Sequence, residues 1–130
     1  MYLGLDLGTS GVKALLIAED QSVVASAQGD LSVSRPADGW SEQDPAHWIR
    51  ATTQALRDFA RQTLLSSVKA IGLSGQMHGG TLLDAYDQVL RPCILWNDTR
   101  SHEAAAALDV DPRLRELTGN IVFPRFTAPK

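Results

Sequence analysis

The amino-acid sequence predicts an α/β domain with a mixed sheet, and three observations support this fold class. Residues 2–7 alternate apolar with other side chains, as a strand with one buried face does. Two more apolar runs of strand length follow closely at residues 12–18 and 23–27, which indicates an antiparallel three-strand meander. An amphipathic helical pattern then separates the meander from another apolar run at residues 68–75.

The helix is expected to begin at Pro45 and to run to about Thr63. Asp44 can accept hydrogen bonds from the free amides of the first turn, and proline is tolerated at the first helical position. The expected buried stripe of this helix comprises Trp48, Thr52, Ala55, Leu56 and Phe59.

The second half of the chain is expected to hold shorter elements, bounded by turn and capping residues. In chain order they are strands at residues 81–85 and 89–96, a helix that starts near Asp98 and includes residues 103–108, and a helix at about residues 112–117 closed by Gly119.

Composition indicates a globular chain without a polyanion-binding surface. With 130 residues, such a chain can bury roughly two-thirds of its unfolded surface. The net charge is −3 and no basic run offsets it, which argues against nonspecific nucleic-acid binding. The N-terminus lacks a signal-peptide pattern, no segment approaches the ~20 apolar residues of a membrane span, and Cys93 has no second cysteine to pair with. We therefore expect a soluble, cytoplasmic protein.

Asp6 stands in the first apolar strand and is followed by a turn at residues 8–11, Gly-Thr-Ser-Gly. Because an unpaired buried carboxylate is costly, this position predicts a partner for Asp6. The glycines permit unusual dihedral angles and close approach to a phosphate, Thr9 and Ser10 add hydroxyls, and Lys13 adds a positive charge. A hard cation such as Mg²⁺, which is bound by one or two carboxylates with waters and phosphate oxygens, would be the partner. The alternative is an ordinary hairpin turn in which Asp6 accepts hydrogen bonds from backbone amides.

A second unusual stretch, SGQMHGG, occupies residues 74–80. It places Gln76 and His78 at the carboxyl end of an expected strand, where α/β sheets bind ligands, and both side chains can hydrogen-bond the hydroxyls of a polyol. The alternative is a solvated loop histidine. The glycines of residues 75–81 have the spacing of a P-loop, but the lysine of that motif is missing.

The stretch LWNDTR, residues 95–100, follows an apolar run. Asn97 could form a wall of the site and reach a substrate hydroxyl, or Asp98 or Thr99 could simply cap a helix. Upstream, Glu42 and Asp44 form a carboxylate pair, which we interpret as structural because Asp44 already explains a helix start.

Four motifs occur in the order and approximate spacing of the FGGY carbohydrate kinases, and the sequence resembles this family, in particular its bacterial xylulokinases. The motifs are Asp6–Lys13, Gly39–Pro45, Gly75–Gly79 and Trp96–Arg100, and the resemblance continues through Thr118–Asn120 and Phe126–Lys130. It implies a ribonuclease-H-like (actin-like ATPase) fold, with residues 1–130 as an incomplete N-terminal domain of a two-domain kinase whose second domain is absent. It also implies ATP-dependent phosphorylation of D-xylulose to D-xylulose 5-phosphate by the parent enzyme, with ATP and Mg²⁺ as cofactors.

The resemblance also implies site residues. They are Asp6 as the catalytic, Mg²⁺-associated carboxylate, Gly8, Thr9, Ser10 and Lys13 at the phosphates, and Gln76, Met77, His78 and Asn97 at the substrate. Glycerol kinases resemble this region but have an Arg-Glu pair in place of the Gln-Met-His sequence. In this family the general-base aspartate and the adenosine-binding domain lie beyond the position of Lys130, so the chain alone is expected to be inactive. Its expected partners are D-xylulose, ATP and the rest of the same protein, with a homodimer as a further expectation.

Three other interpretations stay open at this point. One is a kinase for another ketose or polyol, such as ribulose. Another is an actin-like ATPase module whose nucleotide state controls partner binding, although this leaves the Gln-Met-His sequence unexplained. The third is a noncatalytic domain with an ordinary turn.

Overall fold

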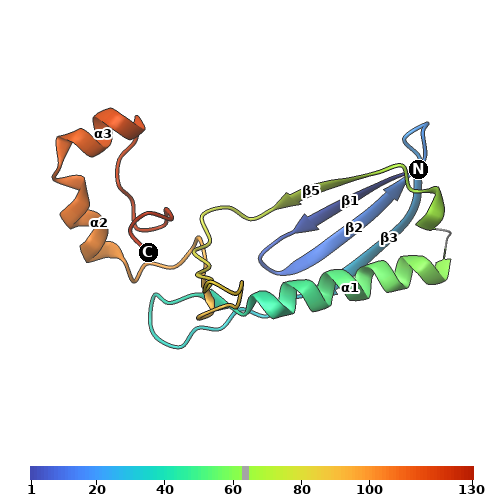
Figure 1. Ribbon diagram of the computed structural model, residues 1–130, viewed down its shortest axis with the longest axis horizontal. Helices are drawn as coiled ribbons and strands as arrows, with labels where there is room; N and C mark the ends of the chain where they lie inside the picture. The colour runs from blue at the N-terminus through green and yellow to red at the C-terminus, as the bar shows by residue number, and fades with distance from the viewer. Residues whose placement is uncertain (63–64) are drawn as a thin grey trace. The chain divides into compact units, whose positions relative to one another are not determined.

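The computed structural model describes residues 1–62 and 65–130, and the chain divides into two compact units (Figure 1). The first unit comprises Met1–Ser32 and Ala46–Gln76, and the second comprises Val33–Pro45 and Met77–Lys130. Among the described residues, no helix has both the length and the apolar character that a membrane span requires.

The first unit is built on a four-stranded mixed sheet, as the sequence predicts. Its strands are β1 (Tyr2–Leu7), β2 (Gly11–Ile17), β3 (Val23–Asp30) and β5 (Ala70–Gly75). They lie in the order β3-β2-β1-β5, with β1 antiparallel to β2, β2 antiparallel to β3, and β5 parallel to β1. The meander is confirmed, and β3 continues three residues beyond the predicted end at Ala27.

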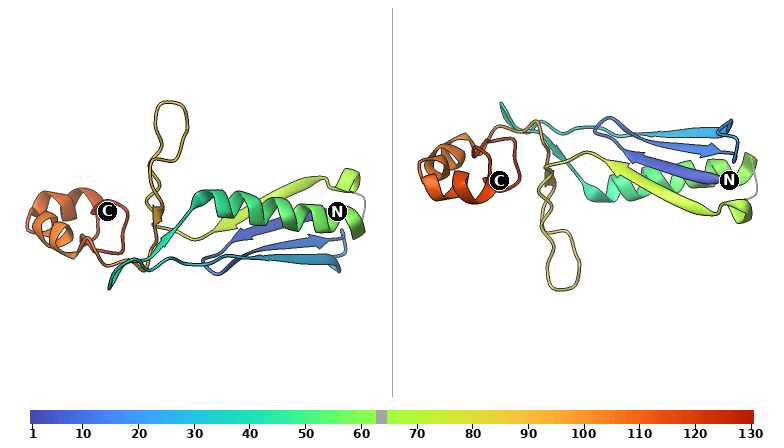
Figure 2. Two further views of the ribbon diagram at one scale, coloured as in Figure 1. Left: turned by 90° about the horizontal axis from the view of Figure 1, so that it is seen from below. Right: turned by 90° about the horizontal axis from the view of Figure 1, so that it is seen from above.

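One face of this sheet packs against helix α1 (Pro45–Gln62), which runs along the strands (Figure 2). The alternation in β1 buries Leu3 and Leu5 on that face and leaves Gly4 and Asp6 exposed on the other. The core cluster comprises Leu3, Leu5, Ala14, Leu16, Ala55 and Phe59.

The predicted helix start at Pro45 is confirmed, and its predicted end at Thr63 lies outside the described residues. The predicted stripe is right for Ala55 and Phe59, which are fully buried, whereas Trp48, Thr52 and Leu56 are only half-buried. Ala51, which the sequence analysis did not single out, is buried.

Gly29 explains the burial of Ala51. A Cβ atom at Gly29 would lie 3.0 Å from both the Cβ and the carbonyl oxygen of Ala51, so this glycine allows α1 to approach β3 closely.

Strand β5 is much less covered than its neighbours. Ile71 and Leu73 pair in register with Leu3 and Leu5 of β1, which places them on the face that α1 covers. Leu73 is nevertheless 76% exposed. Since parallel strands are normally buried on both faces, β5 is an unusually exposed apolar strand.

A short 3-10 turn, η1 (Leu65–Ser67), precedes β5 in the first unit. The second unit contains the two-residue strands β4 (Glu42–Gln43) and β6 (Cys93–Ile94), which pair antiparallel. It also contains the helices α2 (His102–Asp109) and α3 (Pro112–Thr118).

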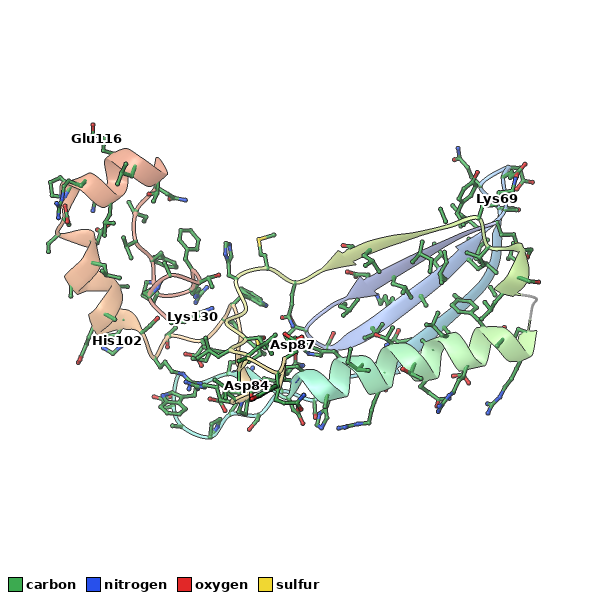
Figure 3. All side chains as sticks on the ribbon, in the orientation of Figure 1. Lys69, Asp84, Asp87, His102, Glu116 and Lys130 are labelled. Carbon is green, nitrogen blue, oxygen red and sulfur yellow. The ribbon has the colours of Figure 1, made fainter. Side chains whose placement is uncertain are left out.

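The strand prediction at residues 81–85 is wrong, and that at residues 89–96 is right only for Cys93–Ile94. A single bridge joins Leu83 to Val89, and between them Asp84, labelled in Figure 3, uses its Oδ1 to accept hydrogen bonds. Its donors are the amides of Tyr86 at 2.8 Å and Gln88 at 2.9 Å. These bonds close a turn at residues 84–88, and the single bridge between Leu83 and Val89 is too little pairing for a strand at residues 81–85.

The prediction for α3 is confirmed, including its closing residue. The Asp111 side chain accepts a hydrogen bond from the amide of Arg113 at 3.0 Å, Pro112 occupies the first turn, and Gly119 has a φ of 66°. That left-handed conformation is what a helix C-terminus commonly requires of glycine.

Candidate functional site

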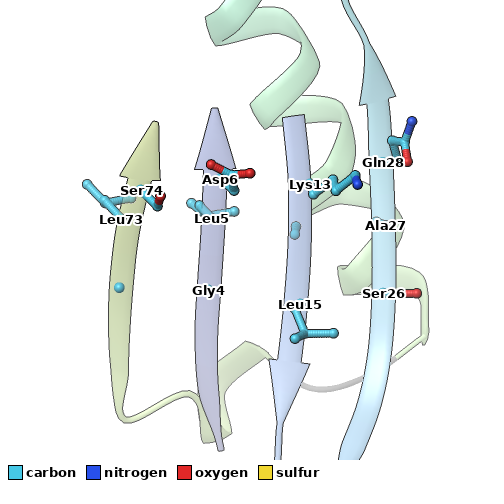
Figure 4. A pocket seen from close by; sticks show the side chains of 12 residues that line it. Gly4, Leu5, Asp6, Lys13, Leu15, Ser26, Ala27, Gln28, Leu73 and Ser74 are labelled. Atoms are coloured by element: carbon cyan, nitrogen blue, oxygen red, sulfur yellow. The ribbon is translucent and has the colours of Figure 1, made fainter. Parts of the chain in front are cut away.

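Four polar side chains form a row across the open face of the sheet in the first unit. Asp6 of β1 is the register partner of Lys13 on β2 and of Ser74 on β5. Lys13 is in turn the register partner of Gln28 on β3. Figure 4 shows the four side chains side by side near one end of the strands. Each strand therefore contributes one polar group to this polar row.

The polar row borders a hollow of about 850 Å³ that is lined by all four of these side chains and by Ser26 (Figure 4). A buried carboxylate would need a partner, but Asp6 lies on the open face of the sheet and is exposed. The side chain is therefore hydrated at little cost, and a bound cation is not needed for folding. Among the described residues, no other side chain forms a hydrogen bond or ion pair with the carboxylate of Asp6.

The Gly-Thr-Ser-Gly turn joins β1 to β2 beside the polar row. The amide of Gly8 donates to the carbonyl of Gly11 at 3.0 Å, and the amide of Leu31 donates to the carbonyl of Ser10 at 3.0 Å. Unusual dihedral angles were expected here, but the only described glycines with positive φ are Gly39 and Gly119. Close approach explains Gly11 instead, since a Cβ there would lie 2.9 Å from the carbonyl oxygen of Gly29.

The turn is joined to the end of β5 by a side-chain hydrogen bond. Thr9 Oγ1 donates to Gln76 Oε1 at 2.9 Å, and the amide of Gln76 donates to the carbonyl of Leu7 at 2.9 Å. Six predicted site residues thus belong to the first unit: Asp6, Gly8, Thr9, Ser10, Lys13 and Gln76.

The other three predicted site residues, Met77, His78 and Asn97, belong to the second unit. Met77 is largely exposed. The ring of His78 lies against Phe126 with a centroid separation of 4.9 Å. Lys130 links His78 to Leu95, because its Nζ donates hydrogen bonds to the backbone carbonyl oxygens of both residues at 2.7 Å.

Asn97 has an unsatisfied acceptor. Its Oδ1 is buried and has no hydrogen-bond partner among the described residues. Leaving a buried polar atom unpaired costs about 1–3 kcal/mol, so such an atom calls for an explanation. Because this oxygen is buried, the Asn97 side chain must turn before a ligand hydroxyl can donate to it.

The predicted helix start at Asp98 is wrong, because α2 begins at His102 and Ser101 precedes it. Asp98 is fully buried and accepts a hydrogen bond from the amide of Ser41 at 2.6 Å. It also pairs with Arg100, whose Nε and Nη2 donate to the two carboxylate oxygens at 3.0 and 2.7 Å. Asp98 is thus a structural ion-pair partner rather than a cap. Thr99 is not a cap either, since its Oγ1 donates to the carbonyl of Gly39.

Arg100 extends this pair into a cluster, which we call the acid–base cluster and which comprises Glu42, Arg91, Asp98 and Arg100. Arg100 Nη1 donates to Glu42 Oε1 at 2.7 Å, and Arg91 Nη2 donates to the same oxygen at 3.1 Å. The guanidinium of Arg100 also lies 3.7 Å from the ring centroid of Trp40. These contacts support the structural interpretation of residues 39–45.

Burial alone would raise the pKa of Asp98 and lower that of Arg100. The mutual hydrogen bonds outweigh burial, so the pKa of Asp98 is lowered and that of Arg100 is raised. Both groups therefore stay charged near neutral pH.

Three residues of the site region escaped the sequence analysis. Gln28 continues an alternation of polar side chains along β3, which was the available signal, whereas Ser74 is the one polar side chain of β5. Lys130 offered no local signal, because two of its acceptors, the carbonyl oxygens of His78 and Leu95, belong to segments remote in the sequence.

Comparisons with known proteins place the chain in a family. Residues 1–130 match the N-terminal domain of the FGGY family of carbohydrate kinases. The xylulose kinase of Escherichia coli (strain K12) is 53% identical over 100% of this chain and 27% of its own length. The crystal structure of a xyloylose kinase from Brucella ovis is 64% identical, with a TM-score of 0.92 over 98% of this chain and 27% of its own.

Plasmodium falciparum glycerol kinase, whose crystal structure is with ADP, has a TM-score of 0.86 over 99% of this chain and 28% of its own. At 21% identity this likeness concerns the fold alone. The chain spans about a quarter of the length of these relatives. The match over all 130 residues and the mixed sheet with its meander confirm the fold class that the resemblance implied: this chain belongs to the FGGY family of carbohydrate kinases.

Proposed function

We propose that this chain is the incomplete N-terminal, sugar- and phosphate-contacting domain of a two-domain kinase that uses ATP to convert D-xylulose to D-xylulose 5-phosphate. The observation that supports this most is the pairing of Asp6 with Lys13 across two strands beside the Gly-Thr-Ser-Gly turn. The hollow beside this pair is lined by the carboxylate, the ammonium group and the hydroxyls of Ser26 and Ser74. The names of the relatives favour D-xylulose among sugars.

Asp6 fits a Mg²⁺ ion that is shared with phosphate. The described residues hold no group of three or more His, Cys, Asp or Glu side chains placed to enclose a metal ion. A single exposed carboxylate suits Mg²⁺, which keeps several waters and binds phosphate oxygens besides one or two carboxylates. When bound, Mg²⁺ would neutralise charge on the transferred phosphoryl group.

Lys13 and the turn would hold the phosphates. The ammonium group of Lys13 can pair with a terminal phosphate oxygen, and Thr9 and Ser10 can donate from their hydroxyls. Gly8 and Gly11 keep the turn free of side chains that would block a phosphate. Because phosphoryl transfer depends mainly on positioning and charge, these groups act by fixing the phosphate relative to the sugar.

The sugar would be bound by Gln76, Met77, His78 and Asn97. Once its side chain turns outward, Asn97 can accept a hydrogen bond from a sugar hydroxyl through Oδ1, and the His78 ring can donate or accept. Gln76 lies next to the phosphate turn through its bond with Thr9, so it would sit where the sugar and the phosphate meet. The base that accepts the proton of the sugar hydroxyl would be supplied beyond Lys130, and we expect no turnover by the chain alone.

A coupled ADP-release assay tests this function, with the chain continued past Lys130 in its natural reading frame. Its substrates would be D-xylulose, D-ribulose and glycerol. Selective turnover of D-xylulose is the expected result. Selective turnover of D-ribulose or glycerol would overturn the substrate, and ADP release that no sugar stimulates would favour an ATPase module. The 130-residue chain serves as the negative control, and turnover by it would contradict the need for a second domain.

A further inference from the structure

His78 has a backbone conformation that its neighbours must maintain. Its φ is 61°, in the left-handed region that residues with a Cβ atom adopt infrequently. The following glycines fix the chain on one side. Gly80 exchanges two backbone hydrogen bonds with Ile94, at 2.9 and 3.1 Å, and a Cβ at Gly79 would lie 2.9 Å from the sulfur of Cys93.

Phe126 supports the side chain of His78. The two rings are 4.9 Å apart between centroids and tilted by 39°, and Phe123 contacts Phe126 edge-on at 5.9 Å. The ring of Phe126 therefore restricts which rotamer the imidazole of His78 can adopt.

Lys130 supports the backbone of His78. Its Nζ donates to the carbonyl oxygens of His78 and Leu95 at 2.7 Å and of Arg125 at 3.0 Å (Figure 3 labels Lys130). An ammonium group has three protons, so these three acceptors use all of its donors. Burial lowers the pKa of Lys130, because it removes water from around the ammonium group.

The three acceptors of Lys130 come from three segments: the loop that contains His78, the segment just before Asn97, and the C-terminal turn that contains Phe126. Because its donors are all engaged, Lys130 is not available as a ligand for phosphate. The geometry suits a different task, which is to hold two sugar-binding segments at a fixed separation.

We propose that Lys130 and Phe126 are positioning residues for the sugar site, fixing His78 and the segment of Asn97 in the geometry that binds the ketose. This inference rests on the proposed function. Neither residue touches the sugar, and both act through the conformation of His78.

The test uses the protein continued past Lys130 and the variants Lys130→Met and Phe126→Leu. Each removes the supporting group and keeps much of the side-chain volume. We expect the KM for D-xylulose to rise about tenfold while kcat and the KM for ATP stay within about twofold, since misplaced binding groups weaken substrate binding. Phe126→Tyr keeps the ring and should leave the KM for D-xylulose at the wild-type value. Lys69→Met and Tyr86→Leu are matched controls at exposed positions and should leave it unchanged.

A second measurement separates this inference from the proposed function. The ¹H–¹³C NMR signal of the His78 ring, assigned by its loss in His78→Gln, should change its chemical shift in both test variants and in neither control. If no sugar is turned over, the proposed function fails and the NMR shift alone decides the inference. Unchanged His78 signals would overturn it, as would an equal loss of kcat, both KM values and thermal stability, which would indicate a general structural role.

Discussion

Thr9 Oγ1 donates a hydrogen bond to Gln76 Oε1 at 2.9 Å, and this bond joins the two sequence motifs that the proposed function assigns to phosphate and to sugar. The two residues lie 67 positions apart. The parallel pairing of β1 with β5 brings them together, since the strands end side by side with Leu7 opposite Gly75.

A double-mutant cycle with Thr9→Val and Gln76→Leu should detect this bond. We expect a coupling of about 0.5–1.5 kcal/mol in the free energy of unfolding, typical of one part-buried hydrogen bond. Urea unfolding of the two single variants and of the double variant measures it. Thr9→Val combined with Gln54→Leu, whose Nε2 instead bonds Asp58, should be additive. Additive effects in the test pair would mean that the bond does not stabilise the protein.

The acid–base cluster should contribute strongly to stability. Arg100→Met leaves the fully buried carboxylate of Asp98 without its guanidinium partner, and breaking a buried pair in this way costs about 3–5 kcal/mol. Arg113→Met is the control, because Arg113 pairs with Asp111 at the surface, where such a pair contributes about 1 kcal/mol or less. Denaturant unfolding compares the two variants. Equal unfolding midpoints for the two variants would show that burial does not strengthen the pair of Asp98 and Arg100.

The lowered pKa of Asp98 makes its contribution depend on pH. Since the folded-state pKa lies below the ordinary value of 3.8, the carboxylate stabilises the fold fully above pH 3.8 and loses this effect as the pH falls through the folded-state pKa. The stability difference between the wild type and Asp98→Asn should therefore be constant above that value and shrink in more acidic solution. Thermal unfolding of both proteins over a pH series measures this difference. A stability difference that grows on acidification would contradict a lowered pKa for Asp98.

Gly29 should not tolerate a side chain. Gly29→Ala places a Cβ 3.0 Å from Ala51 atoms, including a carbonyl oxygen, so α1 must shift, and such overpacking costs about 1–3 kcal/mol. Gly72→Ala on β5 is the control, since nothing lies within 4 Å of a Cβ there. We expect a lower unfolding midpoint for the Gly29 variant alone. The close approach of α1 to β3 would be refuted by two variants of equal stability.

Local patterns in the sequence predicted the first unit well. Leu3 and Leu5 alternate with Gly4 and Asp6, so the two faces of β1 were evident, and the short turn made Lys13 a neighbour of Asp6. Ser74 joins them only through the parallel pairing of β5 with β1, which depends on residues far apart in the sequence. No local pattern specifies that register.

The errors in the second unit have the same origin. Capping rules favoured Asp98 as a helix start, but its carboxylate is engaged by Arg100 and by the amide of Ser41, a residue 57 positions away. Apolar composition favoured a strand at residues 81–85, where the Asp84 side chain closes a turn instead. In both places a side-chain interaction displaced the element that local propensity favours.

The most direct test of the proposed function is D-xylulose-dependent ADP release by Asp6→Asn in the protein continued past Lys130, compared with Asp87→Asn. Asp87 is an exposed turn residue with a φ of 61°, which asparagine also accepts, so its variant should keep wild-type turnover. Asp6→Asn removes the charge that would position Mg²⁺ and phosphate, and we expect kcat to fall by at least about 100-fold with little change in the KM for D-xylulose. If Asp6→Asn turns over D-xylulose as fast as Asp87→Asn, then Asp6 is not in the catalytic site and the proposed role of the polar row is wrong.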